Sequence, residues 1–390
     1  MTTTIQPSEK PKGASGAADL QAPHQPVTAP GAKTSSSTGQ LAHRHWRVGL
    51  LPLLALLLVV AMIVAGAFGE VPISPAHTAA ILLNQTHLFH FPRTWPVTDE
   101  VILLQLRLPR VAGAALVGMA LAVAGVLFQG LLRNPLADPL LLGTSSGAAL
   151  GASIAFVVPA LFTADWFGFG LIPVLAFIGA LLAVALVYWL ASRGGHTPVV
   201  TLLLAGVAVS AVLTAIQTLI ITLNDRLGLQ ISALYLWLAG GVDVQTWVQV
   251  GVIGTLTLLG VFGALLLAPT LDAFALGEEM ASHLGLRVER SKLAIVAVAA
   301  LLVAAAVSIS GLVGFVGLVA PHVCRITLGP RHRFLIPAAG LTGAIFVVVA
   351  DLLARTLASP SEIPLGVVTA LVGGPFFLWL LRYAGRRYTW

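Results

Sequence analysis

The chain has 390 residues, of which 57% are hydrophobic and only 9% are charged. An average soluble domain is about 25% charged, so this composition excludes a soluble fold and predicts an all-α, polytopic membrane protein. The net charge of +6 is attributed to loop lysines and arginines, not to binding of nucleic acid.

Residues 1–42 differ in composition from the rest of the chain. They are rich in proline, serine, threonine, glycine and alanine and show no apolar period, which is typical of a disordered tail. They are not predicted to be a signal peptide, because the first apolar run begins only after "HRHWR" (43–47) and is long enough to cross a bilayer. Residues 43–390 are expected to form one membrane domain.

Ten apolar runs predict ten membrane spans. Nine approach the ~20 residues that a bilayer requires, and they fall at 48–69, 108–132, 140–161, 171–191, 198–222, 246–268, 292–309, 334–356 and 364–382. The tenth is shorter and glycine-rich, "GLVGFVGLVAPHVCRI" (311–326). With ten spans, 16 of the 21 lysines and arginines fall on the N-terminal side. The positive-inside rule therefore predicts that both termini are cytoplasmic.

Five arginines fall on the opposite, extracytoplasmic side, and three of them stand at the ends of membrane spans. "LRLPR" (106–110) places Arg107 and Arg110 at the start of the second span, and Arg355 ends the ninth. Asp351 precedes Arg355 by four residues, which suits an ion pair on one helix face. One interpretation is that these arginines snorkel or pair locally. The other is that they are exposed and bind carboxylates of an external partner, since the guanidinium fork matches a carboxylate.

The connection "RNPLADP" (133–139) has the composition of a tight turn, and Asp138 is expected to cap the next helix. Farther on, His322, Arg325, Arg331 and Arg333 lie on the cytoplasmic side. They are candidates for contact with a partner subunit or with lipid headgroups.

The fifth span carries a polar stripe on an otherwise apolar helix. Its members recur at about one helical turn: Ser210, Thr214, Gln217, Thr218 and Thr222. They either bond other helices and their own backbone, or line a translocation pathway. The segment 227–243 that follows is a candidate for a short outer helix.

The loop 271–292 between the sixth and seventh spans is too polar to cross a membrane. Within it "GEEMASHLG" (277–285) predicts a short helix, with Glu278 and Glu279 in its first turn and Gly285 at its end. A solvated connecting helix and a docking element for another subunit are both compatible with this pattern. No phosphate-binding "GKS" or "GKT" occurs, so ATP would have to be bound by a partner.

Two other classes of function have little support. "GTSSG" (143–147) matches the nucleophile pattern of an intramembrane serine enzyme, but it falls in a predicted helix and no histidine lies deep in a span. An ion-coupled transporter would need intramembrane acids, and Asp351 is the one candidate. We expect no metal site and no cofactor.

Three long blocks resemble the permease subunits of ABC importers for iron–siderophores, haem and vitamin B12. They are "LRLPRVAGAALVGMALAVAGVLFQGLLRNPLADPLLLGTSSGAALGA" (106–152), "SGLVGFVGLVAPHVCRITLGPRHRFLIPAAGLTGAIFVVVADLLAR" (310–355) and "EIPLGVVTALVGGPFFLWLL" (362–381). The resemblance implies the ten-span fold of that family. It also implies a second permease copy or paralogue, two cytoplasmic ATPase subunits and an extracytoplasmic binding protein, in a bacterial cell membrane.

The resemblance also implies roles for the residues above. Arg107, Arg110 and Arg355 would receive carboxylates of the binding protein. The ATPase would contact the short loop helix, with Glu278, Glu279, Ala281, Leu284 and Gly285 as candidates, and the fifth span would border the pathway. A ferric siderophore is the expected cargo because it is the commonest in the family, with vitamin B12 and haem as alternatives.

Overall fold

The computed structural model describes residues 37–69, 71, 73–85, 91–157, 168–192, 194–224 and 228–384. Residues 45–390 cluster as one compact unit and residues 1–44 as another. The predicted tail therefore lies outside the described residues as far as residue 36, and the described chain begins with α1.

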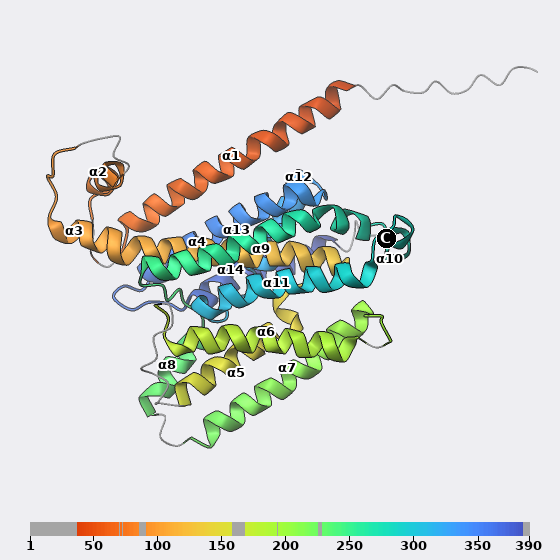
Figure 1. Ribbon diagram of the computed structural model, residues 1–390. Coiled ribbons are helices and arrows are strands. Elements are labelled where there is room, and N and C mark those ends of the chain that lie inside the picture. Colours follow the sequence, from red (N-terminus) through yellow and green to blue (C-terminus); the bar gives the residue numbers. More distant parts are fainter. Residues whose placement is uncertain are drawn as a thin grey trace, which may run out of the picture. The chain divides into compact units, whose positions relative to one another are not determined.

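The described residues are built from helices, and the fold is all-α as predicted (Figure 1). In chain order they are α1 (Ser37–Ala67), α2 (Pro75–Gln85), α3 (Val97–Val101), η1 (Ile102–Arg107), α4 (Leu108–Leu132), η2 (Pro139–Leu142), α5 (Thr144–Val157), α6 (Leu171–Ala191), α7 (Val199–Thr222), α8 (Gly228–Leu238), α9 (Trp247–Phe274), α10 (Glu278–His283), α11 (Val288–Ser310), α12 (Val316–Leu328), α13 (His332–Thr356) and α14 (Leu365–Ala384).

Eight stretches in the described part are long and apolar enough to cross a membrane. They are Gly49–Ala67 of α1, the continuous stretch Val97–Leu132, the helices α6, α7, α9, α11 and α13, and Leu365–Arg382 of α14. The shorter apolar helices α5 and α12 fall in the predicted runs 140–161 and 311–326. Each predicted run thus has its helix, and residues 158–161 of one run lie outside the described residues.

Helix α4 forms the centre of the bundle. It packs against α9, α11, α12 and α13, and 83% of an apolar 18-residue window in its span is buried (Figure 1). Helix α5 packs against α6 and α7, and α6 in turn contacts α11. Only 17% of the α7 span is buried, so most of its surface is left for lipid or for another chain.

Glycines let the central helices touch backbone to backbone. A β-carbon at Gly118 would lie 2.1 Å from the carbonyl oxygen of Gly343 in α13. At Gly125 it would lie 1.9 Å from the carbonyl oxygen of Gly317 in α12. No larger residue fits at either contact without moving a helix backbone.

A π-helical turn precedes α4. The π-helical turn η1 runs directly into α4, where Pro109 has no N–H to donate. The indole Nε1 of Trp247 donates to the carbonyl of Leu104 within η1, at 3.0 Å. At the other end of α4, Asp138 accepts from the backbone N–H of Leu140 at 2.8 Å, which confirms the predicted cap.

Candidate functional site

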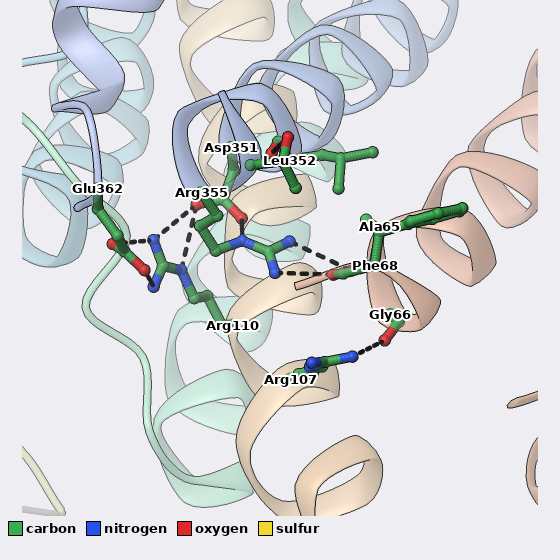
Figure 2. Close-up of polar contacts among 10 residues, drawn as sticks. Ala65, Gly66, Phe68, Arg107, Arg110, Asp351, Leu352, Arg355 and Glu362 are labelled. Carbon is green, nitrogen blue, oxygen red and sulfur yellow. Dashed lines mark hydrogen bonds and ion pairs between the residues drawn. The ribbon is translucent and has the colours of Figure 1, made fainter. Parts of the chain in front are cut away.

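Two arginines from other helices cap the C-terminal end of α1 (Figure 2). A helix leaves its last carbonyls without partners inside the helix. Here they accept from guanidinium groups: Ala65 from Arg355 Nη2 at 3.2 Å, Gly66 and Ala67 from Arg107 Nη1 at 3.1 Å each, and Phe68 from Arg355 Nη1 at 3.3 Å. Arg107 and Arg355 thereby tie the end of α1 to η1 and to the C-terminal end of α13.

Arg355 also belongs to a cluster of four charged side chains whose formal charges sum to zero (Figure 2). Its Nε donates to Asp351 Oδ2 at 2.9 Å, so the predicted pair across four residues is confirmed. Arg110 donates from Nε to Asp351 Oδ1 at 3.2 Å. The two terminal nitrogens of Arg110 each lie 2.9 Å from an oxygen of Glu362.

Burial separates the three arginines. Arg107 is 9% exposed and Arg355 is 6% exposed. The expectation that both are exposed is wrong, because helix carbonyls and Asp351 occupy their donors. Arg110 is partly accessible, with a side chain 24% exposed, and its partner Glu362 is 45% exposed. Water therefore reaches the cluster at the Arg110–Glu362 pair.

Glu362 is a member of this site that the sequence did not single out. It follows α13 after a short connection, 252 residues beyond Arg110. Hydrogen bonds from Arg110 hold the pKa of the Glu362 carboxyl below its ordinary value. The group is therefore ionised at neutral pH. The signal available in the sequence was an acid just before the last apolar run, on the side predicted to carry Arg107, Arg110 and Arg355.

The polar stripe of α7 divides into two parts. Ser210, Thr214 and Gln217 line a cavity of about 330 Å³, together with Ser145 and Ser146 of α5. The hydroxyls of Thr218 and Thr222 donate instead to carbonyls of their own helix, at 2.9 and 2.8 Å. The first three side chains therefore face a cavity, and the hydroxyls of the last two bond their own helix.

The cavity is polar but uncharged. None of the described residues that line it is charged or a histidine. Ser145, the centre of the "GTSSG" pattern, lies in the first turn of a helix, so the strand–turn–helix setting of a serine hydrolase is not present there. The lining offers hydroxyl and amide contacts of modest strength.

The predicted loop helix forms as α10, at Glu278–His283, and Gly285 follows it with φ +85°. Its apolar residues point in different directions: Ala281 is fully buried against the chain, while Met280 and Leu284 are 50% and 62% exposed. Glu279 lines an open cavity of about 560 Å³ beside α10. The helix is therefore anchored on one face and uncovered on the other.

A buried lysine fastens α10 to its surroundings. Lys292 of α11 has a side chain 5% exposed, and its Nζ lies 2.7 Å from Glu278 and 3.2 Å from Glu289. The same Nζ donates to the carbonyl of Thr197 at 2.9 Å, just before α7 begins. Glu289 accepts from the backbone N–H of Thr197 at 3.0 Å. One ammonium group thus joins α10, α11 and the entry to α7.

Known proteins with the same architecture identify this chain. Residues 37–383 match the model of the FecCD transport family. The chain is 43% identical over 287 residues to the cobalamin import system permease protein BtuC of Halobacterium salinarum, covering 74% of this chain and 75% of that protein. It is 43% identical over 288 residues to the hemin transport system permease protein HmuU of Yersinia pestis, covering 72% and 83%.

A solved structure of an ABC transporter assigned to the metal-chelate type, in an inward-facing conformation, has a similar fold. The TM-score is 0.72 at 29% identity, covering 86% of this chain and 99% of that one. The chain belongs to the FecCD transport family: it is a membrane permease subunit of an ABC importer, and ATP hydrolysis lies in separate subunits.

Proposed function

We propose that this permease carries a ferric siderophore complex across a bacterial cell membrane. The observation that carries the proposal is its likeness to iron permeases. The chain is 39% identical over 297 residues to the Fe(3+)-hydroxamate permease protein FhuB of Bacillus subtilis, covering 76% of this chain and 74% of that protein. The uncharged cavity at Ser210, Thr214 and Gln217 is compatible with transit of such a cargo, because a transit path must release what it carries.

Cobalamin and haem are the second candidates for cargo. The relatives named for cobalamin and hemin are each 43% identical to this chain, slightly more than the iron relative. Neutral hydroxyl and amide groups lack the chemistry to select among these three. We place selection in the binding protein and expect the permease to pass what is delivered.

We propose that two copies, or this chain and a paralogue, enclose the pathway between them. The sparse burial of α7 supports this arrangement. Thr214, Thr218 and Thr222 are exposed on that helix beside an apolar surface that includes Leu204, at 65% exposure. The apolar surface would contact lipid or the second copy, and the hydroxyl-bearing surface would border the pathway. Residues 43–390 would form this unit, and a disordered tail would be confined to residues 1–36, because α1 already begins at Ser37.

We propose further that both termini are cytoplasmic and that two ATPase subunits bind at α10. The charge bias of 16 among 21 basic residues supports the orientation. Met280 and Leu284 would enter a groove of the ATPase, with Glu278, Glu279 and Gly285 at its edge. Ala281 would act from inside, by packing α10 against α9.

At the opposite face, the arginine cluster would receive the binding protein. Arg110 is the group that a partner carboxylate can reach, in exchange for Glu362. Arg107 and Arg355 would support docking by holding the end of α1 in place, and would meet a carboxylate only if those helix contacts opened.

Two experiments test these proposals. Cells lacking this chain, and complemented cells, are compared for uptake of iron on hydroxamate and catecholate siderophores, haem iron and labelled cobalamin. Loss of siderophore iron alone supports the proposal, whereas loss of cobalamin or haem alone replaces the cargo.

For docking, Arg110→Glu should weaken binding-protein affinity by about ten-fold or more. Arg93→Glu is the control, because Arg93 is also an exposed arginine paired with an acid, Glu100, but it lies outside the arginine cluster. Equal affinities would refute the docking role of Arg110.

A further inference from the structure

A second polar cavity lies at the opposite end of α4 from Arg107. Its volume is about 280 Å³, and it is bounded by the ends of α4, α9 and α12 and the start of α13. Five polar side chains line it: Gln129, Arg133, His322, Arg325 and His332. We call it the α4–α12 pocket.

Buried polar atoms gather around this pocket. Oε1 of Gln129, both ring nitrogens of His322 and Nε2 of His332 have no hydrogen-bond partner among the described residues. The three side chains belong to residues only 1%, 3% and 4% exposed. A buried polar atom without a partner costs about 1–3 kcal/mol. Four such atoms at one cavity call for a polar occupant that satisfies them.

The charge of the lining is positive. Arg133 and Arg325 bring two guanidinium groups, and none of the described lining residues is acidic. Asp272 lies nearby, but it already accepts from the backbone N–H of His332 at 3.1 Å and contacts the ring Nδ1 at 2.6 Å. The pocket therefore suits an anion.

Arg133 adopts a backbone conformation that glycine would adopt more easily. It ends α4 with φ +49° and ψ +34°, in the left-handed region. A residue with a β-carbon there costs roughly 1–2 kcal/mol. Such strain at a site is a sign that the side chain itself is required. Here that side chain is the cation at the pocket.

We propose that the α4–α12 pocket binds a phosphodiester anion, and that its source is the headgroup of an anionic phospholipid. The two arginines match phosphate oxygens, since a guanidinium fork binds phosphate bidentately. Gln129 and His322 would bond the hydroxyls of a headgroup such as glycerol. Ile326 lines the same pocket and is 64% exposed, which places an apolar surface where an acyl chain would lie. Assignment to the cytoplasmic leaflet rests on the orientation proposed above.

Lipid retention tests the proposal without any transport assay. The full-length chain is reconstituted in nanodiscs of phosphatidylcholine and phosphatidylglycerol, extracted in mild detergent, and analysed by native mass spectrometry for bound lipid. We expect phosphatidylglycerol to be retained at least about ten-fold over phosphatidylcholine. The double variant Arg133→Gln/Arg325→Gln should lose that preference. Arg333→Gln, which removes an exposed cation on the same side but outside the pocket, should keep it.

A second arm separates the two sources of phosphate. Inorganic phosphate is added to the chain in nanodiscs of phosphatidylcholine alone, and the unfolding midpoint is measured. Suppose that phosphate raises the unfolding midpoint of wild type but not of the double variant, and that the first arm shows no lipid preference. These results together would support the anion site and make free phosphate its source. No lipid preference and no phosphate effect in wild type would overturn the proposal, and that result needs no variant to fold. Because neither arm uses cargo or ATP, a positive result beside failed iron uptake would reject only the proposed cargo.

Discussion

The arginine cluster leads to a quantitative prediction for Arg355→Met. Methionine fills much of the arginine's space but removes its charge and its donors. Asp351 is only 1% exposed, and after the change it would keep Arg110 alone, which also serves Glu362. The carbonyls of Ala65, in α1, and of Phe68, just after α1, would lose their donors as well.

The expected loss of stability is about 3–5 kcal/mol, the range for breaking a buried ion pair by removing one partner. Two effects contribute to it. One is the uncompensated carboxylate of Asp351. The other is the pair of helix carbonyls, at roughly 1 kcal/mol each if water does not reach them. Adding Asp351→Asn removes the buried charge, so the double variant should be more stable than Arg355→Met by at least about 1 kcal/mol.

The assay is equilibrium unfolding of the purified chain in detergent, for both single variants, the double variant and wild type. Arg93→Met serves as the control, because the Arg93 side chain is 53% exposed and an exposed ion pair contributes about 0–1 kcal/mol. If Arg355→Met changed stability no more than this control, or if Asp351→Asn added a further loss, the buried-cluster explanation would be refuted.

Three other predictions concern separate parts of the molecule. Lys292→Met should reduce uptake about ten-fold while ATP hydrolysis continues, because α10 is no longer joined to the residues before α7. The control Lys292→Arg should retain most uptake. Normal coupling of hydrolysis to uptake in the methionine variant would contradict the coupling role of Lys292. Gly125→Val should abolish folded protein, at a cost above about 3 kcal/mol. Gly374→Ala should accumulate normally, because a β-carbon there would meet none of the described side chains or other helices within 4 Å. The pKa of Glu362 is lowered from 4.5 by Arg110, so the stability it contributes should be complete above pH 4.5 and lost as pH falls through its lower folded-state pKa. Glu362→Gln should flatten that part of the unfolding profile, and an unchanged profile would exclude the ion pair as its cause.

Features that depend on neighbours along the chain were predictable. The membrane class and the position of each apolar helix follow from composition and run length. The cap at Asp138, the short helix at Glu278–His283 and the Asp351–Arg355 pair lie within a few residues of their partners. Local spacing alone places these groups together, so the sequence was sufficient for them.

Features that depend on packing were decided only by the tertiary structure. Arg107 and Arg355 looked exposed because they end membrane spans, yet the end of α1 covers them. Arg110 meets Glu362 across 252 residues, and the four unpartnered atoms of the α4–α12 pocket come from three separate helices. No local period encodes which helices become neighbours. That choice follows from where glycines such as Gly118 and Gly125 let backbones touch, and it determines which charges are buried, paired or left at the surface.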